Sequence, residues 1–453
     1  MMDANDMNEA IHFGSQDDAL FHQALDALEM MDEAGPMNVK DASDSQESIS
    51  ESQNRALHHA YEANEQSATR MSNVKFSDHN IGSENLTCGP SCNACSAGTG
   101  STSASCTTKT EDSESSLNAF SGVETDRKQK LRLGNTYLTV SNLVAQLWCE
   151  QQMVYNFWKP DLELIVESTS TMPAEHKAAV KAVVAAASSG SRVHEKRDHE
   201  VNKYIPVKVK TREDNYGIRL VNIMVSLRGL LLRGEPCARE IPIFGLPLGH
   251  GFVVVGTIDE LRFDSQGRFE LVEFKTRGDI SRPIRRQQMQ AYKMQMMMYK
   301  KMLEDLGRGH VDGQAVLHGL KMDPHQILND ELLKYVRQLG DASRTSVTLG
   351  ELMSEVMQQF EFLPYVDVLT LEFSSRDDSA TITTETVDFD ADWLQQRLDH
   401  CHAFWAEERD AEGVDIEDTW KCGICAFYDR CEWRQRMNEI CAQKNIARRL
   451  QGK

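Results

Sequence analysis

The chain has 453 residues and a formal net charge of −20, but this charge is distributed unevenly. Residues 1–126 hold 22 Asp and Glu against five Lys and Arg, a net of −17, so residues 127–453 account for only −3. The near-neutral part can still carry a basic groove, and the acidic total therefore does not exclude a nucleic-acid partner. No run of 18 apolar residues occurs, so no membrane partner is expected.

The segment 1–126 is predicted to be a disordered acidic arm, because it is rich in Ser, Asn, Asp, Glu and Gln and contains low-complexity runs. Within it, residues 17–33 place leucines and methionines among acids, a pattern that could fold as a helix against a partner. The first 39 residues contain no Lys or Arg, which argues against a secretory or mitochondrial leader. We expect an intracellular, reducing compartment, with the nucleus favoured over the mitochondrion, where the eleven cysteines are ligands or free thiols.

Residues 127–453 are predicted to form one α/β domain. Helical spacing over 139–160 predicts a first helix that contains Cys149 and begins at a Ser141 cap. An alanine-rich helix is expected over 173–187, followed by a break at Gly190 and a second helix. The other expected elements are strands at 201–212, 238–244, 366–373 and 380–389 and helices at 287–306, 349–362 and 391–412.

The centre of the chain reads as a β-hairpin, with β-rich runs at 252–263 and 268–276. If Gly267 takes the left-handed position of a three-residue turn, Asp264 pairs with Arg268. The register of both strands is then fixed.

Counting back along this hairpin sets Asp259 opposite Glu273, and strand alternation puts Glu273 and Lys275 on one face with Phe274 on the other. Two carboxylates with a lysine beside them suit Mg²⁺ and an attacking water, because the metal lowers the pKa of bound water and the ammonium can orient it. A surface hairpin with a cross-strand charge cluster is the alternative.

Further groups of residues have two possible interpretations each. His194 could join a metal site or be structural. Gln295 and Tyr299, one helical turn apart, could hold a phosphate or a catalytic side chain, or belong to a methionine-rich core helix. A basic cluster that could contact phosphates or be a solvated face comprises Arg277, Arg282, Arg285, Arg286 and Lys293.

A cysteine motif near the C-terminus has the spacing Cys-x2-Cys-x5-Cys and offers three thiolates, those of Cys422, Cys425 and Cys431. Zinc could take Cys441 or His402 as its fourth ligand, whereas an iron-sulfur cluster could recruit the distant Cys149. Spacing alone leaves both possibilities open.

Taken in order, these motifs resemble the RecB-like branch of the PD-(D/E)XK nucleases that carry an iron-sulfur cluster, and most of all the exonuclease V family. The resemblance covers about residues 131–440, and Ile258 stands where the superfamily name places a proline. It implies a central mixed sheet flanked by helices, with a cluster that joins the N- and C-terminal segments. The catalytic residues implied are Asp259, Glu273, Lys275, Gln295 and Tyr299, the metal ligands Asp259, Glu273, Phe274 and His194, and the ligands of a 4Fe-4S cluster Cys149, Cys422, Cys425 and Cys431.

The function implied by this resemblance is Mg²⁺-dependent hydrolysis of single-stranded DNA by an exonuclease in DNA repair or genome maintenance. We expect a monomer whose acidic arm could recruit a single-strand-binding protein. The alternatives are a RecB-like endonuclease resembling the CRISPR adaptation nucleases and a non-catalytic, zinc-stabilised scaffold protein.

Overall fold

The computed structural model describes residues 137–157, 162, 165–166, 172–202, 207–249, 251–278, 280–339, 342–375 and 382–451. All of them belong to one compact unit. The predicted acidic arm, with its boundary at residue 126, lies outside the described residues. No described helix is both long enough and apolar enough to cross a bilayer.

A six-stranded mixed sheet forms the centre of the fold. Its strands are β1 (Leu138–Thr139), β2 (Cys237–Gly245), β3 (Val254–Phe263), β4 (Phe269–Arg277), β5 (Val368–Ser375) and β6 (Ile382–Thr386). One edge of β3 pairs with antiparallel β2. The other edge pairs with parallel β1 at Val254 and Val255 and with antiparallel β4 at residues 260–263. β5 is parallel to β4 and antiparallel to β6.

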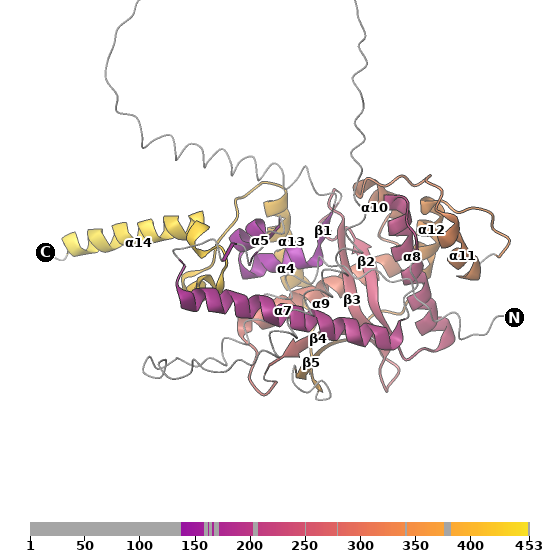
Figure 1. Cartoon of the computed structure of the whole chain (residues 1–453), viewed down its shortest axis with the longest axis horizontal. Helices are drawn as coiled ribbons and strands as arrows, with labels where there is room; N and C mark the ends of the chain where they lie inside the picture. Colours follow the sequence, from indigo (N-terminus) through magenta and orange to yellow (C-terminus); the bar gives the residue numbers. More distant parts are fainter. Residues whose placement is uncertain are drawn as a thin grey trace, which may run out of the picture. The chain divides into compact units, whose positions relative to one another are not determined.

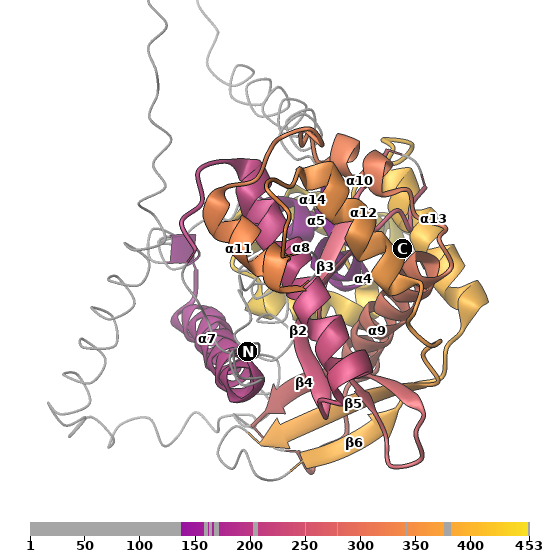
Figure 2. The same cartoon turned by 90° about the vertical axis from the view of Figure 1, so that its right-hand side faces the viewer.

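Helices cover both faces of this sheet. The α-helices are α4 (Val140–Trp148), α5 (Glu150–Asn156), α7 (Ala174–Val201), α8 (Arg212–Arg228), α9 (Arg286–Gly307), α10 (Gly313–Gly319), α11 (Asp330–Leu339), α12 (Leu349–Phe360), α13 (Ala391–Trp405) and α14 (Glu432–Gln451). Shorter helical turns are η2 (Gly229–Arg233), η3 (Ile416–Ile424) and η4 (Tyr428–Arg430). Figure 1 shows α7 running across the sheet, and Figure 2 shows α7 on one side of it and α9 on the other. The fold class is therefore α/β, as predicted.

The centre of the core lies between β3 and α9. Tyr299 of α9 is fully buried, and its ring lies against Gly256 of β3. A Cβ atom at Gly256 would stand 2.8 Å from Tyr299 Cε1 and 3.0 Å from Val140 Cγ2, closer than packed carbon atoms approach. Glycine at this position thus allows α9 to lie close to the sheet.

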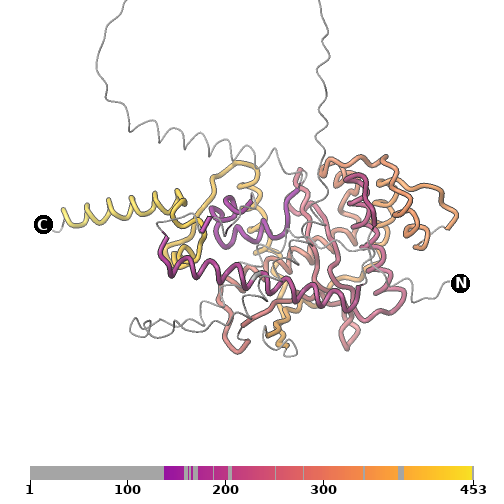
Figure 3. The backbone as a smooth tube through the Cα atoms, in the orientation of Figure 1, coloured from indigo at the N-terminus to yellow at the C-terminus, as the bar shows by residue number. Residues whose placement is uncertain are grey.

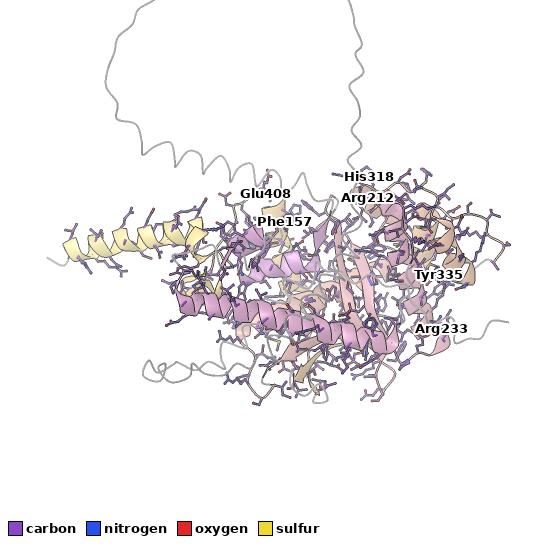
Figure 4. The ribbon with its side chains drawn as sticks, in the orientation of Figure 1. Phe157, Arg212, Arg233, His318, Tyr335 and Glu408 are labelled. Carbon is purple, nitrogen blue, oxygen red and sulfur yellow. The ribbon has the colours of Figure 1, made fainter. Side chains whose placement is uncertain are left out.

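A helical layer of α8, α10, α11 and α12 packs beside β2. The first helix of this layer begins at a capping box, in which Thr211 and Asp214 satisfy each other's backbone N–H groups. Arg212 then donates to the Leu320 carbonyl just beyond α10, at 3.2 Å. Figure 4 labels Arg212 together with His318 of α10. These contacts tie α8, which precedes β2, to the helices that follow α9.

Two predictions for the first helices were wrong. Thr139, not Ser141, is the N-cap of α4, because its hydroxyl accepts the Asn142 N–H at 3.0 Å. The predicted single helix is also split, since Cys149 adopts an extended conformation between α4 and α5. The predicted helix end near residue 160 lies outside the described residues.

Three further boundaries differ from the prediction. Gly190 does not break a helix, because it lies inside α7, which is 28 residues long. A glycine costs only about 1 kcal/mol in a helix, and an alanine-rich stretch precedes this one in α7. The strand expected at 201–212 is absent from the described residues of that range, where α7 ends at Val201 and α8 begins at Arg212. The last predicted helix ends at Trp405 rather than at residue 412.

Candidate active site and cysteine cavity

The central hairpin has the predicted geometry. Gly267 has a φ of 77°, and the Asp264 N–H donates to the Arg268 carbonyl at 3.0 Å. The ladder between β3 and β4 runs from Phe263↔Phe269 to Glu260↔Val272, so one further step in the same register sets Asp259 opposite Glu273. The predicted turn and register are confirmed.

Glu273 and Lys275 form a buried ion pair on the face of β4 that points towards α9. Their side chains are 0% and 1% exposed, and Glu273 Oε1 lies 2.7 Å from Lys275 Nζ. Apart from Lys275, no group in the described part of the chain donates a hydrogen bond to either Glu273 oxygen. Burial and the nearby Asp259 charge raise the pKa of Glu273 to about 8, although Lys275 opposes the shift. The pocket thus holds more negative charge than Lys275 offsets.

Asp259 lies where β3 and β4 diverge, and its two oxygens face different groups. Oδ2 accepts the backbone N–H of Phe274 at 2.8 Å, which fixes the carboxylate beside β4. Oδ1 lies 3.8 Å from Nδ1 of His194, which extends from α7. The structure therefore brings the predicted residues His194, Asp259 and Glu273 to one place.

Glu240 of β2 is a member of this group that sequence reasoning missed. Its Oε1 lies 3.6 Å from His194 Nδ1, and a ligand atom of each of Glu240, His194 and Asp259 lies within 4.8 Å of the others. Burial disfavours the charged form of His194, but Asp259 and Glu240 outweigh it and raise the pKa of His194 to about 9. Nothing in the sequence distinguishes Glu240 from other acids in strands.

An ion network holds α7, and with it His194, on the sheet. The Arg197 guanidinium stacks 3.6 Å from the centre of the Phe274 ring and pairs with Glu260 at 3.1 Å. Arg239 pairs with the same carboxylate at 2.7 Å. Burial would raise the pKa of Glu260, but the hydrogen bond and charge of Arg239 outweigh it and lower that pKa. His194 itself lies edge-on to the Phe274 ring, with centroids 5.4 Å apart.

Gln295 and Tyr299 lie side by side in the core, with Gln295 Nε2 3.3 Å from the Tyr299 hydroxyl. Both are almost completely buried. Two turns earlier, Gln288 donates to Tyr292, whose ring centre lies 5.5 Å from the Lys275 ammonium. These α9 side chains thus pack behind the face of β4 that carries Lys275, and a catalytic role for Gln295 and Tyr299 stays a prediction.

The predicted basic cluster is divided between core and surface. Arg277 is buried; its guanidinium lies 5.2 Å from the centre of the Phe373 ring and donates to the Arg282 carbonyl at 2.9 Å. The remaining members are at least partly exposed: Arg282, Arg285, Arg286 and Lys293. A surface phosphate contact therefore suits these four better than Arg277.

The cysteines from the two ends of the described chain meet in one cavity. Its lining includes Cys149, Cys422, Cys425 and Cys431, whereas Cys441 is exposed on α14. The tube in Figure 3 shows the purple and yellow segments that carry them side by side. Burial raises the pKa of the Cys149 thiol to about 11, and charge on neighbouring cysteines adds to the shift.

The surroundings of the cavity are aromatic and well connected. The rings of Tyr155 and Phe427 lie 5.0 Å apart, and Trp433 also lines the cavity. His176, near the start of α7, places Nε2 3.0 Å from the Cys425 carbonyl oxygen. The cavity is thus tied to the same helix that carries His194.

On the other side of the cysteine cavity, η3 contacts the start of α9. Asp418 accepts a hydrogen bond from Gln287 at 2.8 Å, and the Arg285 guanidinium lies 4.5 Å from the centre of the Trp420 ring. The segment that supplies three cysteines therefore contacts the helix that begins at the basic cluster.

Comparison with known proteins identifies the family. The family described as "Exonuclease V - a 5' deoxyribonuclease" matches residues 128–271, 263–361 and 344–434. Exonuclease V of Danio rerio is 30% identical over 327 residues, which cover 72% of this chain and 76% of that protein. The chain belongs to the exonuclease V family. The protein is accordingly a deoxyribonuclease of the exonuclease type.

The matched segments of the exonuclease V family contain the hairpin, His194, Glu240 and all four cysteines of the cavity. The crystal structure of SSO0001 has a TM-score of 0.31 and 12% identity, covering 69% of this chain and 98% of that one. A likeness at this level supports no conclusion about the site.

Proposed function

We propose that this exonuclease hydrolyses single-stranded DNA with Mg²⁺, from a 5′ end, at the site of Asp259, Glu273 and Lys275. The observation that supports this most strongly is the Glu273 carboxylate, which is fully buried and, among the described residues, has Lys275 as its one partner. A buried carboxylate is costly unless it is paired or binds a cation. Lys275 offsets only one of two neighbouring carboxylates, so the site retains charge for a divalent ion.

The residues present fit a magnesium site in a PD-(D/E)XK core. Asp259, Glu273 and the Phe274 carbonyl supply the oxygen ligands that Mg²⁺ prefers. When bound, the ion would acidify a water molecule and neutralise charge on the phosphate. The Lys275 ammonium would donate to that water and hold it in line with the scissile bond. The Phe274 N–H keeps the Asp259 carboxylate oriented for this purpose.

Replacing Asp259 by Asn tests this assignment. The variant should bind single-stranded DNA as the wild type does but lose cleavage by at least about 100-fold, because one metal ligand loses its charge. Asp264→Asn, at the turn of the same hairpin, is the matched control and should cleave normally. Normal cleavage by Asp259→Asn would rule out the site.

Substrate form separates the proposed exonuclease activity from endonuclease activity. Oligonucleotides labelled at the 5′ or 3′ end should release short products first from the 5′ end, and a closed single-stranded circle should stay intact. Cleavage of the circle would instead support the endonuclease alternative.

We also propose that Cys149, Cys422, Cys425 and Cys431 hold a 4Fe-4S cluster. In the described part of the chain, no three of their sulfur atoms lie within 4.8 Å of one another. A zinc ion with bonds of about 2.3 Å would hold its sulfur ligands about 3.8 Å apart. The wider spacing and the aromatic lining of the cavity favour a cluster, whose role would be to join the two ends of the domain.

Anaerobically purified protein should be brown and contain about four iron atoms per chain. Cys425→Ser should lose the colour and weaken DNA binding, because the segment that contacts α9 loses its anchor. Cys441→Ser, on the exposed helix α14, should keep both. Stoichiometric zinc in place of iron would contradict the cluster and support the scaffold alternative.

The route of DNA and the cellular setting complete the proposal. Arg282, Arg285, Arg286 and Lys293 would contact phosphates of a single strand, and Trp420 beside Arg285 could stack a base.

We propose a role in DNA repair or genome maintenance, as an intracellular monomer in the nucleus. The acidic arm would recruit a single-strand-binding protein; removal of residues 1–126 should abolish that binding but leave cleavage of free oligonucleotides intact.

A further inference from the structure

Glu240 adopts a backbone conformation that is rare for a residue with a β-carbon. It lies inside β2 with a φ of 49°, in the left-handed region that L-residues rarely occupy. Its neighbours keep a regular register with β3, Arg239 opposite Glu260 and Ile241 opposite Ile258, so Glu240 stands level with Asp259. Glycine would relieve the strain, yet a carboxylate is present. Strain of this kind concentrates at functional sites.

The spacing around Glu240 suits ligands of a metal ion better than a hydrogen bond. His194 Nδ1 lies 3.6 Å from Glu240 Oε1 and 3.8 Å from Asp259 Oδ1. Both separations exceed the length of a good N–H···O hydrogen bond, about 3.2 Å at most. An octahedral ion with bonds of about 2.1 Å separates adjacent ligands by about 3.0 Å and opposite ligands by about 4.2 Å. The observed distances of 3.6 and 3.8 Å lie between these two values, so a bound ion would require small shifts of the three side chains.

The two arginines near Glu240 are engaged elsewhere, so among the described residues His194 is the cation that faces both Glu240 and Asp259. The Arg239 guanidinium pairs with Glu260 at 2.7 Å and with Glu200 at 3.0 Å, on the side of β2 that faces α7. Arg197 pairs with Glu260 at 3.1 Å. The carboxylates of Glu240 and Asp259 therefore keep charge available for a ligand, and both are largely buried with side chains 20% and 14% exposed.

We propose that Glu240 is a ligand of a second divalent cation, held by His194, Glu240 and Asp259 beside the ion of the proposed catalytic site. Asp259 would serve both positions, since Oδ1 faces His194 while Oδ2 lies beside Phe274 and β4. The buried Glu273 carboxylate, which pairs with Lys275, borders the other position. Two carboxylates suit Mg²⁺ and Mn²⁺ alike, and we choose Mn²⁺ as the probe because its binding can be followed directly. This inference rests on the proposed function and extends its metal site by one residue.

Binding of Mn²⁺ to the full-length protein tests the proposal without an activity assay. We would follow the free Mn²⁺ signal by electron paramagnetic resonance in the absence of DNA. The wild type should bind two ions per chain, and Glu240→Gln should bind one with wild-type affinity and the other at least about 10-fold more weakly. Glu200→Gln, whose carboxylate pairs with Arg239 outside the site, is the matched control and should bind two ions.

Each outcome separates the inference from the function on which it rests. Two ions bound by Glu240→Gln with unchanged affinity, or a single ion bound by the wild type, would overturn the role of Glu240 and leave the proposed function standing. Unchanged binding by Asp259→Asn would instead remove the whole metal site. His194→Asn should reproduce the loss seen with Glu240→Gln, so a folding defect in one variant leaves the other to decide.

Discussion

Glu240 permits a measurement of the strain stored in β2. The left-handed conformation costs a residue with a β-carbon about 1–2 kcal/mol, whereas glycine adopts it freely. Glu240→Gly should therefore be more stable than Glu240→Ala by about 1 kcal/mol, since both variants lose the carboxylate but only glycine loses the strain. In an ordinary strand position the order is reversed, with alanine favoured by about 0.5–1 kcal/mol.

The sign of this difference is the critical result. Both variants would be purified anaerobically and unfolded thermally under identical conditions, with tryptophan fluorescence as the signal. A difference of about 1 kcal/mol corresponds to about 2–4 °C in Tm for a large domain. If Glu240→Ala melts at the same temperature as Glu240→Gly or above it, the backbone at Glu240 is not strained. Backbone strain then gives no support for a functional role of the Glu240 carboxylate.

Two further predictions concern the interior. Arg409→Ala should destabilise the fold by about 3–5 kcal/mol in urea, because it strips the guanidinium from the Glu150 carboxylate, which is 3% exposed. Arg308→Ala, which breaks a surface ion pair, should cost much less than Arg409→Ala, and equal losses would contradict the reasoning. Gly256→Ala should cost about 1–3 kcal/mol because its Cβ would overlap the Tyr299 ring. Tyr299→Leu should make this substitution less costly, and strict additivity of the two changes would refute the contact.

Local chemistry determined the parts of the site that could be predicted. The turn before Arg268 needs a left-handed residue, and only Gly267 supplies it at no cost, so the register of the hairpin followed. Strand alternation then placed Glu273 and Lys275 on one face. Regular elements of this kind depend on periodicity and turn residues, which are visible in a single sequence.

The parts that sequence reasoning missed depend on contacts between distant segments. Glu240 adopts a conformation that its own preference disfavours, so local reasoning excludes the geometry that the fold imposes. Cys149 interrupts a stretch with helical periodicity because it turns towards cysteines more than 270 residues away. Gly190 stays helical because α7 packs on the sheet and on η3, and packing outweighs a propensity difference of about 1 kcal/mol.

Helix α7 connects the two ends of this enzyme in a mechanical sense. His176 touches the cysteine segment and His194 touches Asp259, and these two residues, 18 positions apart, are separated by about 27 Å of continuous helix. A continuous α-helix is stiff, so a displacement at one end of α7 also moves its other end. Oxidation of the cysteine thiols would disturb the contact at His176 and shift His194, which gives the redox state of the cavity a physical route to the carboxylates of the proposed active site.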